Sequence, residues 1–216
     1  MTEQNQARDL FKAAYENRYT WDSNFPGYSA DIELKQGEEE YRGQIKINGD
    51  MTVEVTGIEG EEISQSVYTQ LRDIVTHRKR NSFEDSHSKN SFTLGETDDT
   101  GASEILVKGD SMGSNYKIRG KEICQVSRVM GRVAFVIDTY ETLDTGNGYL
   151  ATGYDVVFRN PQTNEIITER QHQDKFEKVG DYYLMTQQVI HAKEKGQEIT
   201  TEFNFTNIKL LVPATV

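Results

Sequence analysis

Cysteine is nearly absent from this sequence, and its opening residues do not have the pattern of a secretory signal. Cys124 is the single cysteine among 216 residues, so the chain cannot form an internal disulfide. The opening residues, MTEQNQARDLFKAA, lack both the basic stretch and the apolar stretch of a signal peptide. We therefore expect a cytoplasmic protein.

Long apolar runs and an excess of basic residues are also missing. No run approaches the roughly 18–20 apolar residues that cross a bilayer, so we expect no membrane span. The 35 acidic residues outnumber the 24 basic ones and give a net charge of -11. A charge of this sign repels phosphate backbones and anionic lipid surfaces, which argues against nucleic acid as a partner.

The length suits one globular domain over residues 1–216. A chain of this size removes roughly 70% of its unfolded surface from water when it folds. Hydrophobic residues make up 35% of the chain, which comes close to the usual apolar share of a globular domain once glycine is added. We expect one core with a polar exterior.

Helical periodicity appears in two segments. In residues 5–18 the apolar side chains form one stripe, made of Ala7, Leu10, Phe11, Ala14 and Tyr15. In residues 61–80 the corresponding stripe is Ile63, Val67, Leu71, Ile74 and Val75. The second segment begins with acidic residues and ends with basic ones, an order that complements the helix dipole.

Most of the remaining chain has the period of two that is typical of strands. In residues 29–36, Ala30, Ile32 and Leu34 alternate with charged side chains. Roughly ten or eleven such segments follow one another through short loops, which favours an antiparallel meander because parallel pairing needs long crossovers. We predict an α+β, mostly β fold: a curved antiparallel sheet of about ten strands, forming a half-barrel or open barrel, with two helices covering its concave face.

An aromatic segment, NRYTWDSNFPGYSA, links the first predicted helix to the first predicted strand. It contains Trp21, Phe25 and Tyr28, and Pro26-Gly27 predicts a turn. Two interpretations are open. The rings either pack as a corner over the mouth of the barrel or line a ligand site.

The apolar faces of the last two strands allow the same two interpretations. If the helices fill the concavity, these side chains are core; if they do not, the side chains line a pocket for an acyl chain or a pigment. The residues concerned are Tyr183, Met185, Phe203 and Phe205.

A basic segment stands out in the acidic chain. HRKRNSFEDSHSKN, residues 77–90, is either a helix C-terminus followed by a polar loop or a set of hydrogen-bond donors at the rim of the barrel. In the second case Arg78, His87 and Asn90 would donate hydrogen bonds to a carboxylate or another acidic head group of a ligand.

No catalytic motif in the sequence is followed by the structure that its chemistry requires. GDSMG, residues 109–113, matches the G-x-S-x-G pattern around Ser111, but a strand-like segment follows where a helix is needed, so a hairpin turn is expected. A pair formed by Glu84 and His87 is a weaker alternative. His172 and Asp174 could share one face of a strand but supply two metal ligands at most. We predict no catalytic residue, no metal and no cofactor.

Six segments together carry a resemblance to known proteins: AYENRYTWDSNFPGYSA, GQIKINGDMTVEV, KGDSMGSNYKIR, ETLDTGNGY, DYYLMTQQVI and TEFNFTNIKLL. Over nearly the whole chain they resemble an uncharacterised family of cyanobacteria and photosynthetic relatives, catalogued as a domain of unknown function. At the level of fold, the pattern resembles the half-barrels of the lipoprotein localisation factor A type. That resemblance implies an antiparallel sheet rolled around an apolar concavity.

These observations favour a non-enzymatic binding or carrier protein for a hydrophobic small molecule such as a lipid, isoprenoid or tetrapyrrole. The alternative is an interaction or assembly factor of photosynthetic cells whose acidic outer surface binds a protein partner.

Overall fold

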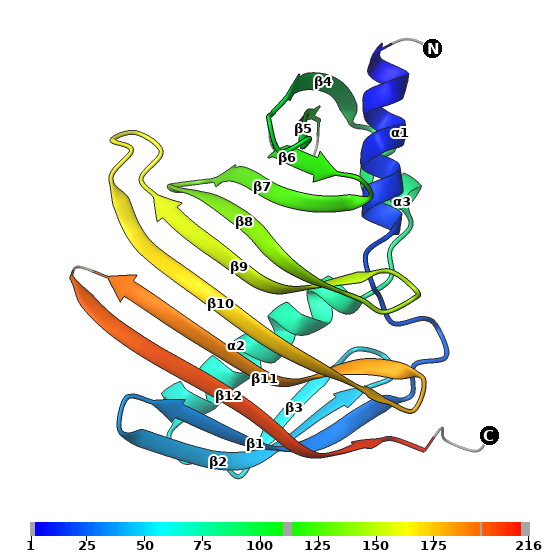
Figure 1. Ribbon diagram of the computed structural model, residues 1–216. Helices are drawn as coiled ribbons and strands as arrows, with labels where there is room; N and C mark the ends of the chain where they lie inside the picture. The colour runs from blue at the N-terminus through cyan, green and yellow to red at the C-terminus, as the bar shows by residue number, and fades with distance from the viewer. Residues whose placement is uncertain (1–2, 110–113, 195, 213–216) are drawn as a thin grey trace. The chain divides into compact units, whose positions relative to one another are not determined.

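The computed structural model describes residues 3–109, 114–194 and 196–212. The chain divides into two compact units (Figure 1). The first unit comprises Met1–Tyr19, Asn81–His172 and Ala192–Glu198, and the second comprises Thr20–Arg80, Gln173–His191 and Ile199–Val216. A single domain over the whole chain stays a prediction.

The described residues form three helices and twelve strands. The helices are α1 (Glu3–Glu16), α2 (Glu61–Arg78) and α3 (Phe83–His87). The strands are β1 (Gly27–Gln36), β2 (Glu39–Asn48), β3 (Val53–Thr56), β4 (Ser91–Thr97), β5 (Ser103–Lys108), β6 (Ser114–Arg119), β7 (Glu122–Met130), β8 (Val133–Asp144), β9 (Tyr149–Arg159), β10 (Ile166–Val179), β11 (Tyr182–Glu194) and β12 (Gln197–Leu210). None of these helices is both long enough and apolar enough to cross a membrane.

The strands form one open antiparallel sheet in the order β3-β2-β1-β12-β11-β10-β9-β8-β7-β6-β5-β4. Neighbours in the sheet are also consecutive in the chain, except where β1 lies beside β12. The predicted fold class, a mostly β chain with an antiparallel meander, is confirmed. The sheet has twelve strands where about ten were expected, and α3 adds a third helix.

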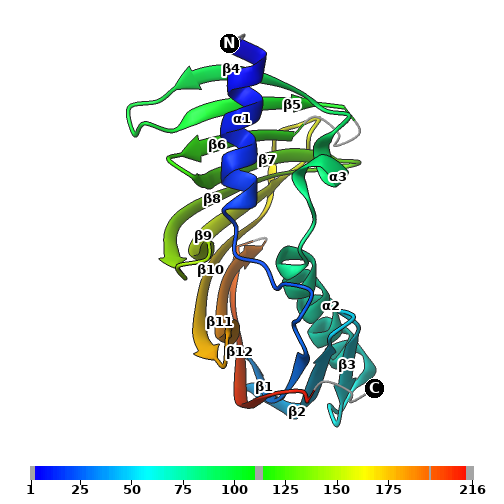
Figure 2. The same cartoon turned by 90° about the vertical axis from the view of Figure 1, so that its right-hand side faces the viewer.

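The core of the first unit lies where α1 crosses its strands (Figure 2). The predicted stripe of α1 is confirmed, because Ala7, Phe11 and Ala14 are buried and the other two members pack against the same cluster. Phe11 lies 4.6 Å from Tyr116 of β6, measured between ring centroids. The remaining buried members of this cluster are Phe83, Phe92, Ile105, Val107 and Ile118.

The core of the second unit lies on the face of β1, β2 and β3 that carries their alternate apolar residues. Ile47 pairs with Tyr28 of β1 on one side and with Val53 of β3 on the other, so the three side chains share a face. Four of the five predicted stripe residues of α2 are buried, namely Val67, Leu71, Ile74 and Val75, and α2 packs against β3.

One predicted turn lies elsewhere than expected. The chain turns at Ser23 and Asn24, where Phe25 N donates to Asp22 O over 3.2 Å and the Asp22 side chain accepts from Asn24 N. Gly27, predicted as part of the turn, is instead the first residue of β1, with a positive φ of 87°. The Asp22 side chain thus helps to form the turn, because its carboxylate accepts a hydrogen bond from the backbone N–H two residues later.

Candidate functional site

The candidate site lies on the face of the first unit's sheet that packs against α1. Tyr116 of β6 contacts Phe11 of α1 and lies directly opposite Val126 of β7. Since residues directly opposite each other in an antiparallel pair point to the same side, Val126 marks the α1 side of β7. The register carries this face onward through β8 and β9.

Two rows of side chains cross these three strands on that face. The first row is Val126, Ile137 and Val156, and the second is Arg128, Phe135 and Phe158. We call the five apolar members the apolar ladder. The Phe135 and Phe158 rings lie 6.2 Å apart, so they form a continuous aromatic surface.

The apolar ladder is less covered than the core beside it. α1 packs chiefly on β4, with smaller contacts to β6 and β7. Val156 is buried, but Phe135, Ile137 and Phe158 are only half-buried. Large apolar side chains left partly in water on one contiguous face are a feature of ligand-binding surfaces.

Arginines lie at the aromatic row. Arg128 donates from Nε to Ser114 Oγ over 2.7 Å and from Nη2 to Tyr116 Oη over 3.2 Å. The guanidinium of Arg170 lies over the Phe158 ring, 5.2 Å from its centroid. In the described part of the chain neither arginine forms an ion pair with a carboxylate. A charge-assisted hydrogen bond to an acidic group is therefore available at this end of the ladder.

His87 and Asn90, two of the predicted donors, lie together in this unit. Asn90 Nδ2 and His87 Nδ1 are 2.9 Å apart, and the His87 ring meets Phe11 and Tyr15 edge-on at 5.1 and 4.9 Å. Burial, followed by the charges of Arg18 and Arg128, lowers the pKa of His87 to about 4. The imidazole is therefore neutral at pH 7, and the positive charge near it belongs to the arginines.

Arg78, the third predicted donor, belongs to the second unit. Its guanidinium lies 5.4 Å from the centroid of the Phe176 ring, and its carbonyl oxygen accepts from Trp21 N over 2.8 Å. Sequence proximity grouped it with His87 and Asn90, but the contacts described for it lie within the second unit.

The predicted aromatic lining residues lie in the interior of the second unit. Trp21 stacks on Phe25 at 4.1 Å, Tyr28 meets Phe25 edge-on at 6.4 Å, and all three rings are at most 3% exposed. Burial raises the pKa of Tyr28. Trp21 Nε1 donates to Tyr183 O over 3.3 Å, which satisfies its only polar atom.

The other predicted lining residues of that unit are mostly core. Phe203 and Phe205 lie opposite Leu34 and Ile32 of β1, and all four are buried. Met185 of β11 is buried as well, and Tyr183 is half-buried. The role of these residues in ligand binding stays a prediction.

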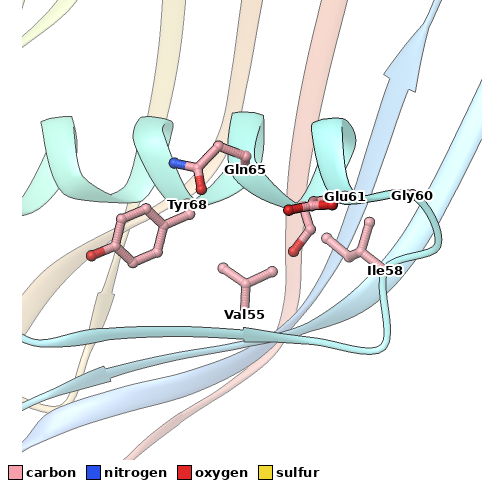
Figure 3. A pocket seen from close by; sticks show the side chains of 7 residues that line it. Val55, Ile58, Gly60, Glu61, Gln65 and Tyr68 are labelled. Carbon is pink, nitrogen blue, oxygen red and sulfur yellow. The ribbon is translucent and has the colours of Figure 1, made fainter.

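A pocket of about 380 Å³ lies between β3 and the start of α2 (Figure 3). Val55 and Ile58 form one wall, and α2 contributes Glu61, Gln65 and Tyr68. The polar and charged groups of α2 leave little apolar surface for a hydrophobic ligand. We therefore place the candidate site on the apolar ladder, where the apolar area is continuous.

Features that could carry catalysis add little to this site. Ser111 lies outside the described residues. The carboxylate of Glu84 is held by Arg8 at 2.7 and 2.9 Å, and this hydrogen bond keeps its pKa below the usual range. His172 and Asp174 are both buried on β10, and no group of three metal-ligating side chains is found within residues 3–109, 114–194 and 196–212.

The sequence reasoning missed the apolar ladder. Arg128 within an apolar strand was a signal, but the stretch RVAFVID has no alternation that assigns one side of the strand to the core. The ladder becomes visible only once Arg128, Phe135 and Phe158 are placed in register.

Comparisons with known proteins show a family without a described activity. A search of the curated proteins finds no match. Among solved structures, the chain is similar to a DUF1329 family protein from Desulfovibrio piger, with 9% identity, 100% of this chain and 96% of the other covered, and a TM-score of 0.30. It is also similar to a domain from Vibrio parahaemolyticus described as a proposed outer membrane lipoprotein-sorting protein, with 8% identity, 98% and 95% covered, and a TM-score of 0.33. TM-scores this low carry no argument about function. The family model for DUF3386, a protein of unknown function, matches residues 2–211, and the chain therefore belongs to the DUF3386 family.

Proposed function

We propose that this protein binds a hydrophobic small molecule with an acidic head group, as a binding or carrier protein. The observation that carries the proposal is the half-buried apolar ladder with Arg128 in its aromatic row. The apolar part of the ligand lies along Ile137, Phe135 and Phe158. Its carboxylate or phosphate accepts hydrogen bonds from Arg128.

The magnitudes support useful affinity. Each methylene removed from water contributes about 0.8 kcal/mol, so ten contribute about 8 kcal/mol before the cost of association. A hydrogen bond to a charged group adds about 1.5–3 kcal/mol. A long-chain acid therefore suits this surface better than the corresponding alcohol does.

A displacement assay tests the proposal. The fluorescent fatty acid cis-parinaric acid is titrated into the protein and then displaced with oleic acid or oleyl alcohol. We expect saturable binding and stronger displacement by the acid. Phe135→Asp places a charge in the ladder and should weaken binding at least about tenfold. Tyr140→Asp, an exposed position on the same strand, introduces the same charge outside the ladder and should leave binding unchanged.

Carotenoids and bilins belong among the competitors. The resemblance to proteins of photosynthetic organisms suggests a pigment or isoprenoid ligand, and tetrapyrroles carry propionate groups that suit Arg128. A failure of cis-parinaric acid, carotenoids and bilins alike to give a saturable response would contradict the proposal. Retention of a protein partner without any small molecule in a pull-down would favour the interaction factor instead.

A further inference from the structure

Two hairpins of the first unit end close together at one end of its sheet. Met130 and Val133 form the last pair of β7 and β8, and Ala134, the next residue, pairs with Arg159 of β9. The turn after Arg159 is closed by Asn160 N, which donates to Glu165 O over 2.9 Å. Because β9 and β10 are neighbours in the sheet, the turns 131–132 and 160–165 lie at the same end.

Exposed apolar side chains concentrate at these hairpin ends. Eight large apolar residues are exposed in the described part of the chain, and four of them lie here, which is more than scattered exposure would give. They are Val129 (49% exposed), Met130 (49%), Ile166 (48%) and Ile167 (42%). Each hairpin contributes two, one on each side of its strand, so the patch surrounds the strand ends.

The charge of the same hairpins is opposite in sign to that of the whole chain. The β7–β8 hairpin carries Arg128 and Arg132 and has no acidic residue between Ile123 and Ile137. In residues 156–170, two arginines balance two glutamates, so the two hairpins together are basic within a chain of net charge -11. Arg132 is exposed in the turn, two residues after Met130.

We propose that these hairpin ends dock the protein on an anionic lipid bilayer. Met130 and Ile166 enter the boundary between head groups and acyl chains, and Arg132 contacts lipid phosphates. The acidic remainder of the chain does not prevent this, since charges farther away than about 8 Å are largely screened at physiological ionic strength. The proposal goes beyond ligand binding, because none of the four exposed apolar residues at the hairpin ends belongs to the apolar ladder.

Co-flotation with lipid vesicles tests this docking without any added ligand, so its result is independent of the proposed function. We expect the protein to float with vesicles of phosphatidylcholine and phosphatidylserine and to stay behind with phosphatidylcholine alone. The double variant Met130→Asp/Ile166→Asp should lower partitioning at least about tenfold. Arg132→Gln should lower it about fivefold and make it less sensitive to salt.

Controls separate docking from damage to the fold. Tyr140→Asp adds a negative charge at an exposed position outside the patch and should float as the unchanged protein does. Circular dichroism checks that each variant is folded. The proposal is overturned if the intact protein ignores anionic vesicles, if it binds neutral vesicles equally well, or if the double variant floats normally. It is also overturned if the double variant instead abolishes a dimer seen by analytical ultracentrifugation, because the patch would then serve a second copy of the chain.

Discussion

Arg128 of β7 lies directly opposite Phe135 of β8, and Phe135 in turn lies opposite Phe158 of β9. A cation and two half-buried rings therefore form one cross-strand row. The hydrogen bonds of Arg128 to Ser114 and Tyr116 hold its guanidinium beside the row without neutralising it. This arrangement can distinguish a ligand's head group from its apolar part.

Arg128→Gln should separate these two contributions. We expect it to weaken binding of oleic acid about tenfold, equivalent to about 1.4 kcal/mol, and to change the affinity for oleyl alcohol little. The displacement assay measures both. Arg119→Gln removes the same charge from an exposed residue that donates to Thr100 and should change neither affinity. An equal loss for acid and alcohol would show that Arg128 acts on the fold and not on the head group.

Gly27→Ala should strongly destabilise the second unit. Gly27 has a φ of 87°, and a Cβ there would overlap the Ile47 carbonyl oxygen and approach Asn48 C at 2.8 Å. Backbone strain and steric overlap together should cost about 3 kcal/mol or more. Gly37→Ala is the matched control, since it has a φ of 61° but no neighbouring atom within 4 Å; its cost should be about 1 kcal/mol. Urea unfolding followed by Trp21 fluorescence compares the two, and equal losses would contradict the steric argument.

Local sequence patterns predicted the helices and strands, whereas the candidate site depends on which residues lie opposite one another in neighbouring strands. The stripe of α1 and the alternation in β1 are visible in the sequence because each depends on neighbours a few residues away. The apolar ladder depends on which residues of β7, β8 and β9 lie opposite one another. Turns and bulges set that register, such as the shift between Lys117 and Ile118 where β6 pairs with β7. A single sequence does not show where such a shift occurs.

The three predicted donors show the same difference between local contacts and contacts that depend on the fold. His87 and Asn90 are three residues apart, and their contact is local, so the sequence could place them together. Arg78 is separated from them by the turn that leads into α3. That helix was expected as a polar loop, although Ser82 was a readable signal: its side chain accepts from Asp85 N over 3.0 Å and begins the helix.

Phe11→Ala should cost the first unit about 3–5 kcal/mol of its free energy of unfolding, because it opens a cavity among closely packed rings. Phe11 is 1% exposed and lies within about 5.4 Å of the Phe92 and Tyr116 ring centroids. Leu10→Ala, one position earlier on the half-buried side of α1, should cost about 1–2 kcal/mol. Thermal unfolding followed by circular dichroism measures both. Similar losses would show that the α1 stripe is not oriented as described.

His87 should make the protein less stable in mild acid. Burial lowers its pKa to about 4 in the folded chain, whereas the unfolded value is about 6.5. Between these values the unfolded chain binds a proton that the folded chain does not, so stability is greatest above about pH 6.5 and falls as the pH approaches 4. The loss should be on the order of 2 kcal/mol.

Urea unfolding at several pH values measures this loss and compares it with His87→Phe, which keeps an aromatic ring among Phe11 and Tyr15 but cannot titrate. His87→Phe should lose the destabilisation in mild acid that His87 causes and keep the destabilisation due to carboxylates. His77→Gln, at an exposed position on α2, should still show the destabilisation that His87 causes. If the free energy of unfolding changed with pH in the same way in the protein and in His87→Phe, the pKa of His87 would be the same in the folded and the unfolded chain.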